Sequence, residues 1–190
     1  VRPEGEAVAR LEDLSTGEIR WQQLIHFVSK SAFDIDGLGE KILAQLMEEG
    51  LIEDAVDIFR LQKDDLVGLE RFAETSAQNL IDSIKEHSRV NLGRFIYALG
   101  IRHVGAKTAT DIAQHYHKLN NFMNAKAEDL RNIEGIGGVV AESLTAWLED
   151  GNNHKLVNDL LSAGVSVSTE KSKATGKFSG TTWVFTGTLD

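Results

Sequence analysis

The chain of 190 residues contains no cysteine and no run of 18 apolar residues. Without cysteine it can form neither disulfides nor thiolate metal sites, which favours a cytoplasmic protein. Without a long apolar run it has no membrane-spanning helix, and its N-terminus lacks the layout of a signal peptide. The chain opens on Val1 within a polar stretch and stops at Asp190 just after an apolar one, so we expect a piece of a larger protein.

The chain also has few positive charges, and its net charge of −9 argues against a nonspecific polycation. The charges are unevenly spread, however. Residues 94–118 hold four Lys or Arg and one acid, Asp111, whereas residues 40–74 hold ten acids and four bases. One surface could therefore meet an anionic partner while others repel it, and much of that contact would come from uncharged backbone donors.

A five-residue pattern occurs four times, at residues 35–39, 69–73, 101–105 and 133–137, which we call hairpins 1 to 4. Each copy begins with an apolar residue, has another apolar residue at its fourth position and is followed by a helical pattern. The last positions of the copies are 34, 32 and 32 residues apart. One copy could be an ordinary helix-capping turn, but four in register predict a repeated helix-hairpin-helix unit.

The chemistry of this unit suits a phosphate ligand. Glycine opens backbone conformations that other residues avoid and lets main-chain N–H groups approach a partner. The helix that follows contributes free N–H groups and the positive end of its dipole, so a phosphate oxygen fits without any base being read. The fourth positions should plug into the core, and small residues later in three helices should let paired helices approach closely. The plugs are Leu38, Phe72, Val104 and Ile136; the small residues are Ala77, Ala109 and Ala141.

The rest of the chain predicts a mainly α fold. Apolar residues at helical spacing between Trp21 and Val28 indicate a helix that packs on the next domain. Two short helices are expected within residues 119–131, and a final helix at about residues 153–162 should end at Gly164. A short extended piece follows at 165–168. The apolar run 178–188 reads as a strand with nothing to pair with, which implies a missing domain.

These features resemble the C-terminal half of the bacterial NAD-dependent DNA ligases, over nearly the whole chain. The stretch from Arg94 to Gly105, RFIYALGIRHVG, is the most specific. The other similar stretches are GEAVAR at 5–10, HFVS at 26–29, DIDGLG at 34–39, GLERF at 68–72, SAQNL at 76–80 and FTGTL at 185–189.

The resemblance implies four domains. Residues 1–31 would be the remnant of a zinc-finger-like connector, and residues 32–168 a helix-hairpin-helix domain of two tandem pairs, each about a pseudo-twofold axis. Residues 169–175 would be a linker, and 176–190 the truncated first strand of a BRCT domain. The family's finger carries cysteines where Leu11 and Thr16 stand here, so we predict no zinc. His26, the only nearby imidazole, is more typical of a packing residue than of a ligand.

The resemblance also implies the activity. Such enzymes transfer AMP from NAD to a lysine and then to the 5′ phosphate of a nick, which is sealed by the 3′ hydroxyl. The lysine, NAD and Mg²⁺ would lie upstream, so no residue here is expected to be catalytic. This piece would grip nicked double-stranded DNA on the minor-groove side, as a monomer, in the cytoplasm and associated with the nucleoid.

The predicted DNA-binding residues lie in and just after the hairpins. Lys41 and Lys107 could add point charges or simply be solvated, and Thr108 could donate to phosphate or to its own helix. Arg71 stands where hairpins 1 and 4 have glycine. The complete set is Gly37, Gly39, Lys41, Arg71, Thr75, Arg102, His103, Gly105, Lys107, Thr108, Gly135, Gly137 and Gly138. Arg94 lies outside this set, because its side chain could pair with an acid of a neighbouring helix as readily as with a phosphate.

Two alternatives remain at this point. The module could belong to another DNA-repair protein, such as an excision nuclease subunit or a junction-binding protein. It could also be a scaffold that does not bind DNA. An upstream adenylation domain would favour the ligase, and an inert acidic hairpin surface would favour the scaffold.

Overall fold

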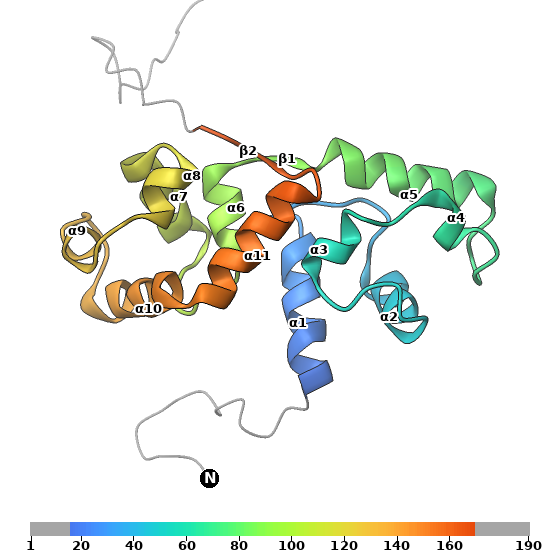
Figure 1. Ribbon diagram of the computed structural model, residues 1–190, viewed down its shortest axis with the longest axis horizontal. Coiled ribbons are helices and arrows are strands. Elements are labelled where there is room, and N and C mark those ends of the chain that lie inside the picture. The colour runs from blue at the N-terminus through green and yellow to red at the C-terminus, as the bar shows by residue number, and fades with distance from the viewer. Residues whose placement is uncertain (1–15, 170–190) are drawn as a thin grey trace, which may run out of the picture.

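The computed structural model describes residues 16–169, which form a mainly helical structure with one small sheet (Figure 1). The helices alternate with the four hairpins, as the sequence predicted. The elements are α1 Thr16–Val28, α2 Glu40–Glu48, α3 Ala55–Ile58, α4 Lys63–Leu66, α5 Glu74–Glu86, β1 Arg89–Asn91, α6 Leu92–Ala98, α7 Ala106–Tyr116, α8 Leu119–Met123, α9 Ala127–Arg131, α10 Gly138–Glu149, α11 Gly151–Ser162 and β2 Ser166–Ser168.

The hairpins are grouped in pairs over two hydrophobic clusters. Leu38 of hairpin 1 and Phe72 of hairpin 2 belong to the first cluster, and Val104 of hairpin 3 and Ile136 of hairpin 4 belong to the second. In Figure 1, α2, α4 and α5 form one end of the molecule and α7 to α10 the other. The predicted division into two pairs is confirmed, whereas the twofold symmetry within each pair stays a prediction.

Helix α6 contributes to both clusters. Phe95 and Ala98 belong to the first cluster, while Leu92 and Ile96, on another face of the helix, belong to the second. Asn91 caps the helix, because its Oδ1 accepts from the Arg94 amide at 2.9 Å. The two pairs of hairpins therefore share one short helix as a common support.

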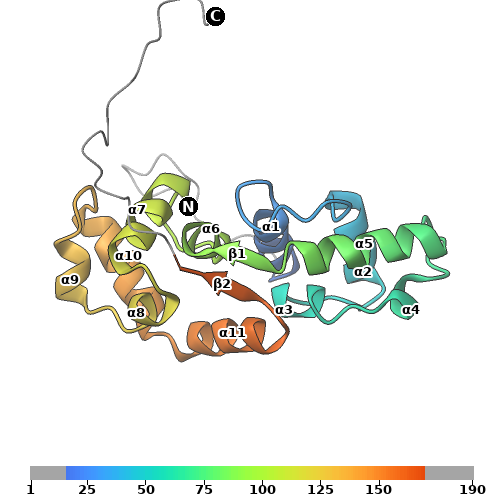
Figure 2. The same ribbon diagram turned by 90° about the horizontal axis from the view of Figure 1, so that it is seen from above.

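The last described segment returns from the second pair to the first. Val157 and Leu160 of α11 are buried in the first cluster, and so is Val165, which precedes β2. Strand β2 pairs in parallel with β1, with Val167 opposite Val90 (Figure 2). The sequence predicted an extended piece here but not its partner, because strand pairing joins residues far apart in the chain.

Helix α1 packs on the first pair, as expected from its apolar face. Leu24, Phe27 and Val28 are buried in the first cluster, and the His26 Nε2 lies 2.7 Å from the Tyr97 carbonyl oxygen of α6. The domain boundary at residue 31 stays a prediction. Residues 1–15 and 170–190, which include most of the predicted linker and the whole predicted BRCT strand, lie outside the described residues.

Two local features differ from or add to the sequence prediction. Helix α11 begins at Gly151, two residues before the predicted start, because the Asp150 carboxylate accepts from the Asn152 amide at 2.8 Å and caps the helix there. Helices α6 and α7 approach closely at Gly93, where an added Cβ would lie 3.3 Å from the Thr110 Cα. The small residues Ala77, Ala109 and Ala141 are buried, as predicted.

Candidate functional site

The four hairpins are built on the same tight turn. In each one, the first residue's carbonyl oxygen accepts a hydrogen bond from the fourth residue's amide, at 3.4, 3.0, 3.0 and 3.1 Å in hairpins 1 to 4. The third residue has a positive φ in every case: 85° at Gly37, 73° at Arg71, 65° at His103 and 83° at Gly135. A positive φ at this position defines a type II turn. The fourfold sequence pattern is therefore a fourfold backbone geometry.

The fifth residue of each hairpin is the N-cap of the helix that follows. These residues are Gly39, Ala73, Gly105 and Gly137, with φ between −83° and −75° and ψ between 165° and 175°. None of the four makes a side-chain capping hydrogen bond. The first-turn amides that a cap would occupy are therefore left for another acceptor.

The space in front of these helix ends is open. A Cβ added to Gly39, Gly105 or Gly137 would meet no heavy atom within 4 Å, and the third and fifth residues of every hairpin are exposed. The fourth residues, by contrast, are buried, from 1% exposed at Leu38 to 8% at Ile136. The predicted core plugs are confirmed, and they turn the polar backbone of each hairpin outward.

The side chains of the predicted site surround this backbone in different ways. Arg102 and His103 are exposed, and neither forms a hydrogen bond or ion pair within residues 16–169. Arg71 Nε lies 3.7 Å from a Glu70 carboxylate oxygen, and Lys107 Nζ lies 2.8 Å from the Asp111 carboxylate.

Three further side chains of the predicted site are those of Lys41, Thr75 and Thr108. Lys41 and Thr75 are exposed, and Thr108 is half-buried. Within the described part of the chain, neither threonine hydroxyl forms a hydrogen bond. The expected alternative for Thr108, a bond to its own helix, is therefore not formed.

The structure brings hairpins 1 and 2 together through direct contacts. Gln45 of α2 donates its side-chain amide to the Glu70 carbonyl oxygen at 2.9 Å, and a Cβ on Gly37 would lie 3.7 Å from Leu80 Cδ1 of α5. The buried apolar residues of hairpins 3 and 4 belong to the same cluster, the second one. Hairpins 1 and 2 are thus neighbours, as paired motifs require, and hairpins 3 and 4 share one hydrophobic core.

Sequence reasoning missed one residue that shapes hairpin 2. The Ser76 hydroxyl donates to the carbonyl oxygens of Arg71 and Ala73, at 3.2 and 2.9 Å, and so ties the turn to the first turn of α5. Its position near the helix start was a usable signal, because serine commonly bonds to nearby backbone there.

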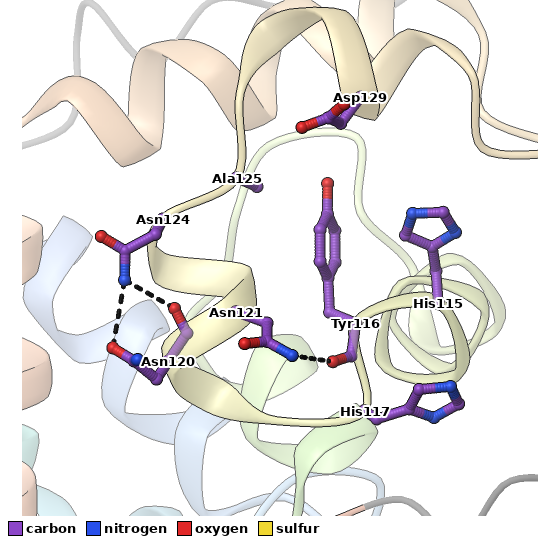
Figure 3. Close-up of a pocket in the computed structure, with 8 residues that line it drawn as sticks. All are labelled: His115, Tyr116, His117, Asn120, Asn121, Asn124, Ala125 and Asp129. Carbon is purple, nitrogen blue, oxygen red and sulfur yellow. Dashed lines mark hydrogen bonds between the residues drawn. The ribbon is translucent and has the colours of Figure 1, made fainter.

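The concave pocket of the second pair lies at the end of α7 and is lined also by residues of α8 and α9 (Figure 3). Its volume is about 550 Å³, and the Tyr116 ring points across it toward Asp129. Burial, and secondly the negative charge of Asp129, raise the pKa of the Tyr116 phenol. None of the predicted site residues lines this pocket.

The described residues offer neither a metal site nor a membrane span. Within residues 16–169, no three His, Asp or Glu side chains gather as metal ligands would. Over the same range, every helix is too short or too polar to cross a bilayer. The prediction that zinc is absent therefore still rests on the sequence alone.

Two family models match the chain, one for each pair of hairpins. Residues 30–86 match the SAM-like helix-hairpin-helix tandem family, and residues 94–157 match the helix-hairpin-helix motif family. The division of the matches agrees with the two hydrophobic clusters.

Curated proteins similar to the whole chain are named DNA ligase. Those of Geotalea uraniireducens and Pelotomaculum thermopropionicum are 39% and 41% identical to it over 189 and 191 residues, and that of Halothermothrix orenii is 41% identical over 197 residues. All of this chain is covered, but only 28%, 28% and 29% of these relatives. The chain belongs to the bacterial DNA ligase family, as the segment that carries its tandem helix-hairpin-helix motifs.

Proposed function

We propose that this chain is the duplex-binding segment of an NAD-dependent DNA ligase. Its hairpins would hold the sugar-phosphate backbone of nicked DNA from the minor-groove side. The observation that carries the proposal is the fourfold repeat of an exposed turn followed by an uncapped helix N-terminus. Aligned backbone N–H groups and a positive dipole end favour a phosphate oxygen at each of these places.

This arrangement explains how an acidic chain can bind DNA. Its donors are mostly main-chain amides, which do not enter the net charge of −9. Arg71, Arg102, Lys41 and Lys107 supply point charges beside the amides. Lys107 would exchange its Asp111 partner for a phosphate, at little cost because the ammonium is exposed. Binding through phosphates should depend on salt and show little sequence preference.

The complete protein would seal single-strand nicks in replication and repair. NAD and Mg²⁺ would act through other parts of the protein, as the resemblance to the bacterial NAD-dependent DNA ligases implies. The names of these relatives, DNA ligase, support this assignment over another repair protein.

An aspartate at the fifth hairpin position tests the proposal, because it separates binding from stability. Gly39→Asp, Gly105→Asp and Gly137→Asp each place a helix-capping carboxylate where the phosphate would bind. There is room for each side chain, and aspartate is a better N-cap than glycine by a few tenths of a kcal/mol. We expect unchanged or slightly higher stability, and an affinity for nicked duplex about tenfold or more weaker, or about 1.4 kcal/mol.

Asn152→Asp is the matched control, because it adds one negative charge in the first turn of α11, a helix that no hairpin precedes and that Asp150 already caps. Binding should be measured by fluorescence anisotropy at several salt concentrations, and stability by urea unfolding. If the three hairpin variants bind duplex no more weakly than Asn152→Asp, the hairpins do not hold phosphate and the proposal fails.

A further inference from the structure

Arg94 of α6 grips the loop that leads into hairpin 1, although 62 or more residues separate them. Its Nε donates to the Ala32 carbonyl oxygen at 2.7 Å and its Nη2 donates to the Lys30 carbonyl oxygen at 2.8 Å. The same Nη2 lies 3.6 Å from an Asp34 carboxylate oxygen. The sequence left open a pairing of Arg94 with an acid of a neighbouring helix. The acid that it meets, Asp34, lies in a loop instead, and the two carbonyl acceptors were not indicated by the sequence.

The loop that Arg94 binds is itself held by packing and by a backbone hydrogen bond. Ala32 and Phe33 are buried, and the Phe33 ring meets the Phe95 ring edge-on, with centroids 6.3 Å apart. Asp34 adopts φ 59°, and its amide donates to the Ser29 carbonyl oxygen at 3.0 Å. Hairpin 1 begins at the very next residue, so the position of the loop fixes the position of the hairpin.

Helix α6 is also the first helix of the hairpin 3 unit. It ends at Ala98, three residues before Ile101, and its Leu92 and Ile96 are buried in the second cluster. Arg94 therefore joins two elements that each lead directly into a hairpin, one from each pair. No other described arginine or lysine donates to a backbone carbonyl in another element.

We propose that Arg94 is a positioning residue that holds hairpin 1 in fixed register with hairpin 3, so that both pairs bind the same duplex. The proposal rests on the proposed function. Two linked binding sites gain affinity only when their geometry lets them engage together, and a rigid link keeps that gain. Arg94 itself does not contact DNA in this scheme, because its donors already face two carbonyls and a carboxylate.

Arg94→Lys tests this role, because it keeps the positive charge but loses the planar fork that reaches two carbonyls at once. A direct phosphate contact would largely survive this change, whereas the positioning would not. We expect about a tenfold loss of affinity for a nicked duplex long enough for both pairs. Arg89→Lys changes an exposed arginine of strand β1; it is the matched control and should bind like the parent chain.

A double-mutant cycle separates positioning from a general loss of structure. In the parent chain, Gly39→Asp and Gly137→Asp should each weaken binding. In the Arg94→Lys background, Gly39→Asp should lower the affinity for nicked duplex by less than a further threefold, because hairpin 1 no longer binds the DNA. Gly137→Asp should lower the affinity as much as it does in the parent chain. The role of Arg94 would be overturned if Gly39→Asp lowered the affinity equally in both backgrounds, or if Arg94→Lys bound duplex like the parent chain. If Gly39→Asp and Gly137→Asp are harmless in the parent chain, it is the proposed function that fails.

Discussion

Arg71 in hairpin 2 has the same left-handed backbone conformation as Gly37 in hairpin 1, with φ of 73° and 85°. A residue with a Cβ pays about 1–2 kcal/mol for that conformation, and glycine does not. His103 in hairpin 3 is in the same situation, with φ 65°. Two of the four turns thus place a non-glycine residue in a strained backbone conformation, although glycine serves at this position in the other two. Backbone strain of this kind commonly marks a functional residue.

Arg71→Gly should weaken duplex binding without destabilising the fold. The strain that glycine relieves is offset by the extra freedom of glycine in the unfolded chain, about 0.5–1 kcal/mol, so stability should change by less than about 1 kcal/mol. The slope of log affinity against log salt concentration should fall in magnitude by about 0.9, which is the change expected for the loss of one phosphate contact. Anisotropy titrations at several salt concentrations measure this slope. Arg71→Lys should keep it, and an unchanged slope in Arg71→Gly would show that Arg71 makes no phosphate contact.

Alanine at Gly135 and at Gly137 should have different effects on stability, although both sites are open. Gly135 has φ 83°, so its alanine variant should lose about 1 kcal/mol of unfolding free energy. Gly137 has φ −75°, an ordinary conformation, and Ala73 fills the same position in hairpin 2. Its alanine variant should be nearly neutral, because the lower entropy of the unfolded chain offsets the weaker N-cap preference of alanine. Urea unfolding of the two variants checks the prediction, and equal effects would contradict the turn assignment.

Gly93→Ala should destabilise the contact between α6 and α7. Helix propensity alone would favour alanine by about 1 kcal/mol. The added Cβ, however, would lie 3.3 Å from the Thr110 Cα, and such overpacking against backbone costs about 1–3 kcal/mol. We expect a net loss of about 1 kcal/mol in urea unfolding. Gly151→Ala, in the first turn of α11 with no atom within 4 Å, is the control and should not lose stability.

Tyr116→Phe should be neutral or stabilising by about 1 kcal/mol near pH 7. The buried Tyr116 hydroxyl forms no hydrogen bond within residues 16–169, so its removal ends a desolvation cost. Because burial and Asp129 raise the phenol pKa in the folded state, the folded chain keeps this proton longer than the unfolded chain. The contribution of this pKa difference to the free energy of unfolding is fully present below pH 10, the ordinary phenol pKa. It is lost as the pH rises through the higher pKa of the folded state.

Thermal unfolding of both chains between pH 8 and pH 11, on either side of the ordinary phenol pKa of about 10, tests this titration. The advantage of Tyr116→Phe over the parent chain should grow with pH above 10. A constant difference would show that the phenol titrates alike in the folded and unfolded states.

The local units of this fold could be predicted from the sequence because each depends on neighbouring residues. The fourfold spacing predicted the turns, and alternation with helical patterns predicted the plugs at Leu38, Phe72, Val104 and Ile136, all of which are buried. The predicted DNA-binding residues are exposed around the turns, except for the half-buried Thr108, but their contacts with DNA stay predictions.

What the sequence by itself determined is the repeat: an apolar, glycine-rich pattern sets φ, capping and burial within a few residues. Only the tertiary structure decided how the repeats are joined. The hydrogen bonds from Arg94 to the Lys30 and Ala32 carbonyls and the pairing of β2 with β1 connect residues more than 60 positions apart. Helix α6 is also shared between the two clusters. Such contacts leave no periodic signal, because they depend on the packing of whole elements rather than on the spacing of neighbours.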